Sequence, residues 1–150
     1  MTFKTTLLAA IAAIGLSAAA FAGDHSHSAP AVQDYDVVTY HTGKRPLRGN
    51  GNFVANHDGA VYLFSSLENL ELFEANPDRY VPAYNGYCAL GVSVGKKFIG
   101  DPEVWRVVDG RTYLNLDAAI QSNWLKDVPG CTRRADNNWK EIWDKDPASL

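Results

Sequence analysis

Apolar and polar positions along the chain form two pairs of short strand-like runs, and each pair is joined by an Asp-Gly turn. Asp-Gly between such runs favours a two-residue hairpin turn, because both turn positions adopt positive φ angles. The pattern therefore predicts two antiparallel β-hairpins. In chain order, the runs and turns are residues 53–56, Asp58-Gly59, residues 60–64, residues 105–108, Asp109-Gly110 and residues 112–115.

Helical spacing follows the first hairpin. Leu67, Leu70 and Phe73 form one apolar stripe, and Ser65 with Glu68 three residues later is typical of a capping box at its start. The stripe stops before an Asn-Pro step, which favours the end of a helix. These signals predict one helix directly after the first hairpin.

Three further helices are predicted around the second hairpin. Tyr87, Leu90 and Val94 recur at helical spacing, with Gly95 placed to end that helix. Cys88 is therefore expected on a short, half-buried helix. A helix over residues 117–126 and a last one over about residues 132–143 are separated by a Pro-Gly break.

Hairpins and helices in alternation indicate the α+β class. We expect a small single domain of antiparallel β-hairpins packed with short helices, over residues 34–146. No internal repeat is evident from the sequence.

The first 22 residues are typical of a secretory signal peptide. Lys4 precedes an apolar run over residues 7–20, and Ala20-Phe21-Ala22 resembles a cleavage site. A spanning helix needs about 20 apolar residues, so a retained membrane anchor is the weaker reading. We expect export, most simply to a bacterial periplasm, no stable membrane insertion after cleavage, and a flexible leader over residues 23–33.

The net charge of the chain argues against nucleic acid as a partner. Cleavage after Ala22 would leave 128 residues (150 minus 22) and change the formal net charge from −3 to −4, because Lys4 is the only charged residue removed. Nucleic-acid binding needs a basic face, which this composition does not favour. The expected partner is a metal ion or a small ligand.

The central part of the chain carries an ordered set of motifs that resembles the exported members of the YHS-domain family. The resemblance covers roughly residues 34–142. It indicates a family more clearly than it indicates a biochemical function. Its motifs are Tyr84-Asn85-Gly86-Tyr87-Cys88-Ala89, Gly100-Asp101-Pro102, Trp105, Asp109-Gly110, Tyr113-Leu114-Asn115 and Ala135-Asp136-Asn137-Asn138-Trp139.

The resemblance also argues against one metal site. Metal-binding YHS relatives carry Phe-Cys-Ser-x-x-Cys where a strand runs into a helix. Here Ser65 and Asn69 stand in the two cysteine places. A hydroxyl and an amide are poor ligands for copper(I) or zinc, which thiolates bind well.

Cys88 and Cys131 are the only cysteines. In an oxidising compartment two cysteines most often form a disulfide, and we expect that pairing here. The alternatives are two separately buried thiols, or Cys88 as a reactive thiol or metal ligand.

Four aromatic residues, Tyr84, Tyr87, Trp105 and Tyr113, are candidates for a ligand-binding surface. Aromatic residues at strand and helix spacing more often fill a core, and that alternative stays open.

Signal cleavage would create a separate metal site at Gly23-Asp24-His25. The α-amine, two backbone amides and an imidazole at the third residue form a square-planar set that suits copper(II) or nickel(II). Asp24 is not proline, so its amide can ionise, and His27 can assist. The alternative is a polar spacer in which His25 stands by chance.

We expect a non-catalytic exported protein that binds or handles a metal such as copper. The alternative is an interaction module that binds a partner or small ligand through its aromatic residues. His41 and His57 lie outside any local catalytic motif, so an enzyme is not expected.

Overall fold

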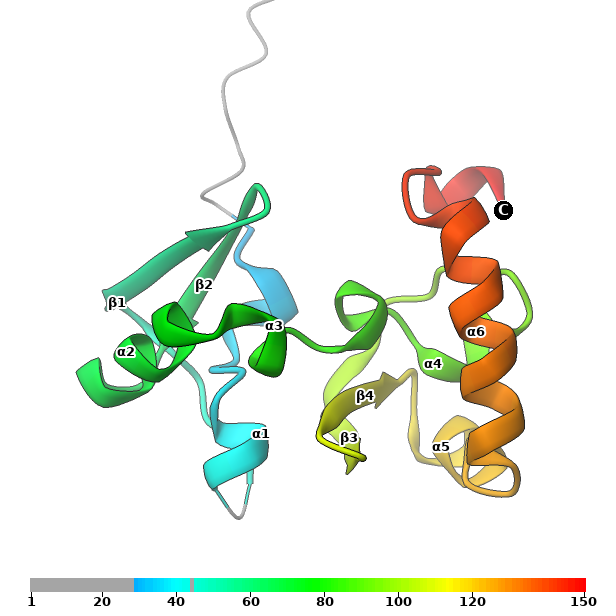
Figure 1. Cartoon of the computed structure of the whole chain (residues 1–150), viewed down its shortest axis with the longest axis horizontal. Coiled ribbons are helices and arrows are strands. Elements are labelled where there is room, and N and C mark those ends of the chain that lie inside the picture. Colours follow the sequence, from blue (N-terminus) through cyan, green and yellow to red (C-terminus); the bar gives the residue numbers. More distant parts are fainter. Residues whose placement is uncertain (1–28, 44) are drawn as a thin grey trace, which may run out of the picture.

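The computed structural model describes residues 29–43 and 45–150, which fold into helices and two antiparallel two-stranded sheets (Figure 1). The α+β class is confirmed. The elements in chain order are η2 (Ala31–Asp34), α1 (Thr39–Thr42), β1 (Asn50–His57), β2 (Ala60–Phe64), α2 (Leu67–Ala75), α3 (Pro77–Tyr80), η3 (Ala83–Gly86), α4 (Ala89–Ser93), β3 (Asp101–Val108), β4 (Arg111–Asn115), α5 (Ala118–Trp124), α6 (Val128–Ile142) and η4 (Pro147–Ser149).

Both predicted hairpins are confirmed, β1–β2 and β3–β4. Asp58 and Gly59 have φ angles of 48° and 76°, and Asp109 and Gly110 have 49° and 78°. Two successive positive φ angles match the right-handed twist of the flanking strands, which is why Asp-Gly is favoured there.

Two predicted helix starts were wrong. Ser66, not Ser65, caps α2, and its side chain accepts a hydrogen bond from Asn69 N. The expected break at Pro129-Gly130 lies inside the first turn of α6, which Asp127 caps by accepting from Gly130 N. Proline fits a first helical turn because the missing N–H has no intrahelical partner there.

The element order repeats. The first unit, η2 to α3, and the second unit, η3 to α6, each contain a tight turn, a short helix, a hairpin and two helices. Figure 1 shows the units side by side, with β1, β2 and α1–α3 in one group and β3, β4 and α4–α6 in the other.

Backbone details repeat as well. The paired turn residues Val32 and Gln33 have φ angles of 52°, and Tyr84 and Asn85 have 57° and 54°. Both hairpins combine a strand of eight residues with one of five, and both have a register shift at the same place. The chain is therefore a tandem repeat of one α+β unit.

The expectation that the chain has no internal repeat was therefore wrong. The repeat is hard to see in the sequence because few residues are identical between the two units. Before the hairpins, matching residues are 52 positions apart, and from the glycine before each hairpin onward they are 51 apart. The identical pairs are Pro30/Pro82, Ala31/Ala83, Tyr35/Tyr87, Gly43/Gly95, Lys44/Lys96, Gly49/Gly100, Asp58/Asp109, Gly59/Gly110, Tyr62/Tyr113 and Leu63/Leu114.

Each unit has its own apolar core, and β3–β4 contributes to both. Leu114 lies in the first core, against which Trp105 and Val107 also pack, whereas Tyr113 lies in the second core with Trp124. Successive strand residues point to opposite faces, so neighbours on β4 reach different cores. The second hairpin thus joins the two units into one folded body.

Candidate ligand-binding site

The two repeated turns are strained. Val32 is β-branched and Tyr84 is bulky, yet both adopt the left-handed conformation that favours glycine. Each such residue costs roughly 1–3 kcal/mol, and such strain clusters at ligand-binding and catalytic sites. From the first turn, Gln33 Nε2 donates to the carbonyl oxygen of Gly100, the residue before β3, at 3.1 Å.

A cleft of about 560 Å³ lies between these turns. Val32 and Gln33 from η2, and Asn85 and Gly86 from η3, contribute to its lining. Roughly 300–1,000 Å³ is the usual size of a small-molecule site. We call this hollow the Lys97 cleft, after the only charged residue among those described that line it.

Lys97 is 8% exposed, which is unusual for a lysine. Its Nζ donates to the carbonyl oxygen of Trp143, the C-cap of α6, at 2.8 Å, and to Lys145 O, three residues beyond the end of α6, at 2.6 Å. A cation is favourable there, because helix dipoles leave negative charge at the last carbonyl groups. The ammonium also lies 5.3 Å from the ring centroid of Tyr87 and 5.4 Å from that of Trp139.

One donor of this ammonium remains for a ligand. An ammonium has three N–H donors, and two of them bond to carbonyl groups. No third acceptor occurs within residues 29–43 and 45–150. Tyr87, Leu114 and Trp143 supply apolar wall. The cleft therefore combines a buried cation with apolar surface.

The four aromatic residues predicted as a ligand surface do not form one surface. Tyr84 and Tyr113 are 3% and 5% exposed and belong to the second core. Trp105 packs against Tyr40 at the first core, with ring centroids 5.3 Å apart. Only Tyr87 lines the Lys97 cleft.

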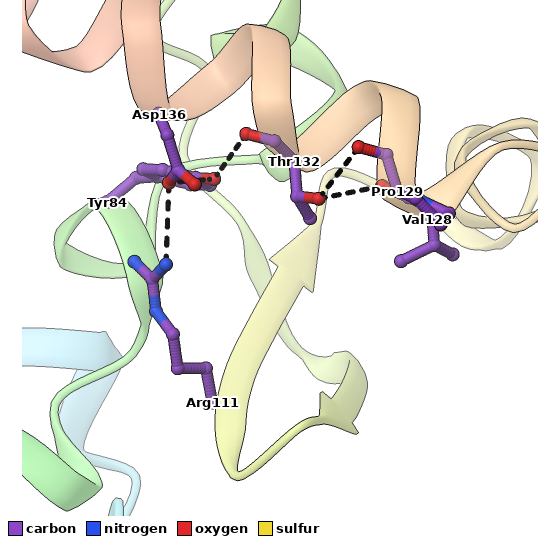
Figure 2. A network of polar contacts seen from close by, with 6 residues as sticks. All are labelled: Tyr84, Arg111, Val128, Pro129, Thr132 and Asp136. Carbon is purple, nitrogen blue, oxygen red and sulfur yellow. Dashed lines mark hydrogen bonds and ion pairs between the residues drawn. The ribbon is translucent and has the colours of Figure 1, made fainter.

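Tyr84 instead anchors η3 to α6. Figure 2 shows the Asp136 carboxylate next to the Tyr84 hydroxyl and the Arg111 guanidinium. The Tyr84 hydroxyl donates to Asp136 Oδ1 at 3.0 Å, and Arg111 Nη1 donates to the same oxygen at 3.4 Å. Burial, followed by this hydrogen bond, raises the pKa of Tyr84 well above its usual value. Tyr84 therefore stays protonated and structural.

Ser65 and Asn69, the two residues considered above in place of metal-binding cysteines, belong to a polar cluster around Asp36. The fully buried Asp36 carboxylate accepts from Ser65 Oγ at 2.6 Å, from Ser65 N at 2.8 Å and from Asn69 Nδ2 at 2.7 Å. Its other oxygen accepts from Val38 N at 3.0 Å. These bonds satisfy the carboxylate without a cation, so the cluster joins the starts of α1 and α2.

Both cysteines are free and buried in the structure. Cys88 is the N-cap of α4, where its Sγ accepts from Gly91 N and lies 3.7 Å from Asn115 Oδ1. Cys131 Sγ, on α6, accepts from Arg134 Nη2 at 3.3 Å. The disulfide between them stays a prediction for the exported protein, as does a metal-binding role for Cys88.

The predicted copper residues Gly23, Asp24, His25 and His27 lie outside the described residues. Within residues 29–43 and 45–150, no three His, Cys, Asp or Glu side chains are grouped so that they could hold a metal ion. In that same part of the chain, no helix is both long and apolar enough to span a membrane.

Sequence reasoning missed Lys97 and Trp143 as site residues. Lys97 follows Lys96 and looks like one of two exposed lysines, and Trp143 follows it in the chain by 46 positions. The available signal for Lys97 was the pair of glycines that flank it, Gly95 and Gly100, which is typical of a turn with a close approach of the backbone; Trp143 has no such signal. Nothing in the local pattern indicated which lysine is buried.

Comparison of the chain with models of protein families, with curated proteins and with solved structures gives no match.

Proposed function

We propose that this chain is an exported, YHS-type binding protein without catalytic activity, and that the Lys97 cleft binds a small organic anion with an apolar body. The buried ammonium group of Lys97 is the observation that supports this class of ligand. Two of its three N–H donors bond to carbonyl groups, and the other described residues that line the cleft are uncharged. The order of YHS-like motifs and the signal-like first 22 residues support the family and the compartment.

The chemistry of the cleft favours a carboxylate. A hydrogen bond to an ionised partner contributes about 1.5–3 kcal/mol, and exclusion of water strengthens it. Tyr87, Leu114 and Trp143 would cover the apolar part of the ligand. An uncharged analogue of the same length would keep the apolar contacts and lose the charged one.

Octanoate and octan-1-ol are a suitable pair of probes for the mature chain. We expect octanoate to bind at least about tenfold more tightly, which corresponds to about 1.4 kcal/mol. Calorimetric titration measures the affinity of each probe. The amide NMR shifts of Tyr87, Ile99 and Leu114 during the titration show whether the probe binds in the cleft. Equal affinity of the two probes would reject an anion site.

A neighbouring lysine offers a matched control. Lys97→Met should remove the preference for octanoate, and Lys97→Arg should keep part of it because the charge remains. Lys96→Met changes an exposed lysine that does not line the cleft, so it should leave both affinities unchanged. Equal losses in the two methionine variants would show that net charge, not the cleft, determines binding.

A second candidate function is copper binding at the mature amino terminus, which the sequence Gly23-Asp24-His25 favours. It would act independently of the folded domain. Binding requires the α-amine and two amides to lose protons, so copper affinity should rise with pH. Loss of the metal should leave thermal stability nearly unchanged.

Intact mass of the exported protein first tests whether cleavage follows Ala22. Copper(II) titration should then give one equivalent bound to the wild type and none to His25→Ala, while Cys88→Ala binds normally. Cleavage elsewhere, or full binding by His25→Ala, rules this candidate out without affecting the Lys97 cleft.

A further inference from the structure

A second hollow lies in the second unit. It has a volume of about 140 Å³ and opens to the surface beside α4 and α5. No lining residue is shared with the Lys97 cleft. Its seven lining residues, all apolar, are Cys88, Leu90, Gly91, Val94, Phe98, Leu116 and Ile120.

The repeat identifies what this cavity corresponds to in the first unit. By the spacings of 52 and 51 residues, Cys88 corresponds to Asp36, Leu116 to Ser65 and Ile120 to Asn69. Those three first-unit residues are the hydrogen-bonded cluster that joins α1 and α2. At equivalent positions, the first unit thus has a cluster of polar groups that are hydrogen-bonded to one another, and the second unit has an apolar hollow.

A fourth pair of equivalent positions also has a polar residue in the first unit and an apolar residue in the second. Val94, at the rim, corresponds to Thr42, whose hydroxyl bonds to Val38 O. Val94, Phe98 and Leu116 are 66%, 49% and 43% exposed. Exposed apolar side chains are normal singly, but a group around a cavity marks a binding surface.

Size and lining determine the class of ligand. An enclosed, wholly apolar cavity of about 150 Å³ stays dry and admits benzene or xenon. This hollow has a similar volume and an apolar lining, and it is open to the surface on one side. The Cys88 thiol at its base is 1% exposed and already engaged with Gly91 N and Asn115 Oδ1, so it adds surface and not charge. We propose that the cavity above Cys88 binds a small, neutral, apolar molecule of about the size of one aromatic ring.

Benzene is the probe for the test, which uses the mature chain and methyl and amide NMR spectra. We expect saturable shifts at Leu90, Leu116 and Ile120. The corresponding first-unit residues Val38 and Asn69 provide an internal control and should not shift. Shifts that do not saturate, or that occur equally in the two units, would overturn the proposal.

A filled cavity gives the second test. Ile120→Trp places a large side chain in the hollow and should abolish the benzene shifts, whereas Leu125→Trp, at an exposed position that does not line it, should leave them. If the spectrum shows that Ile120→Trp does not fold, Leu116→Trp at the rim replaces it. Undiminished binding by a folded filled variant contradicts the assignment. Octanoate binding in the Lys97 cleft should be the same in all these variants.

Discussion

At the scale of single residues, equivalent positions in the two units have taken opposite chemistries. Asp36 is a fully buried carboxylate, and Cys88 at the matching place is a buried thiol. A buried charge is tolerated only when hydrogen bonds replace its lost hydration. Asp36 meets this condition through Ser65, Asn69 and Val38.

Asp36→Asn should destabilise the protein by about 2–4 kcal/mol. The amide nitrogen would replace one of the two carboxylate oxygens, so either Val38 N or the donors of Ser65 and Asn69 would lose their acceptor. Urea unfolding measures the change. Asp34→Asn is the matched control, since Asp34 is half-exposed in its ion pair with Arg48 and should change stability by less than about 1 kcal/mol.

His41 makes stability depend on pH. Its Nε2 lies 2.9 Å from Thr112 Oγ1 on β4, and its ring packs edge-on against Tyr80. Burial, with repulsion from Arg79, lowers the pKa of His41 below its ordinary value of 6.5. Between the folded pKa and 6.5 the unfolded chain binds more protons, so stability should fall as pH decreases below about 6.5.

Replacing His41 with Gln should remove that part of the pH dependence. Urea midpoints measured from about pH 8 to about pH 5 should fall less steeply for His41→Gln than for the wild type. Identical slopes would mean that His41 does not cause the dependence.

At the scale of elements, the glycine before each hairpin sets how closely the chain passes the second strand. A Cβ on Gly49 would lie 2.6 Å from Leu63 Cβ and closer still to the Leu63 carbonyl group. A Cβ on Gly100 would lie 2.6 Å from Leu114 Cβ and from Gly86 O. Both units thus need glycine here for lack of space, although neither residue has a positive φ.

Gly49→Ala should therefore destabilise the protein by about 3 kcal/mol, because backbone atoms must move to admit one methyl group. Gly51→Ala, on β1, is the matched control: no heavy atom lies within 4 Å of its added Cβ. We expect the control to change stability by less than about 0.5 kcal/mol. Similar losses in the two variants, measured by urea unfolding, would exclude the close approach as the cause.

At the scale of the whole molecule, two cores share one hairpin. Leu114 and Tyr113 are neighbours on β4, and they lie in the first and second core respectively. His41 and Tyr40 add hydrogen bonds from the first unit to Thr112 and to Pro102 O. Loss of the hairpin would expose both cores, so the units cannot unfold separately.

We expect one cooperative unfolding transition. Trp124, Trp139 and Trp143 belong to the second unit or its C-terminal end, so tryptophan fluorescence reports mainly there, while Trp105 also senses the first core against which it packs. The methyl NMR signals of Val37 and Val38 report on the first core alone. The two probes should share one urea midpoint, and Trp105→Ala should lower it for both. Separate midpoints would show that the units are independent domains.

The fold class and both hairpins could be predicted from the sequence because their signals are local. An Asp-Gly pair and an alternating run specify a hairpin within a dozen residues. The starts of α2 at Leu67 and of α6 at Val128 could not be placed, because they depend on whether a side chain caps the helix or bonds elsewhere. Ser65 bonds to Asp36, which lies 29 positions earlier.

The sequence by itself determined the local elements and their turns, since these depend on the conformational preferences of residues a few positions apart. Only the tertiary structure decided which lysine is buried, which aromatic residues fill a core and which polar groups meet. Lys97 bonds to carbonyl groups just after α6, and Asp36 bonds to Ser65 and Asn69, and these partners are far apart in the sequence. Such contacts depend on how the elements pack, which is also why the repeat is plain in the backbone and faint in the sequence.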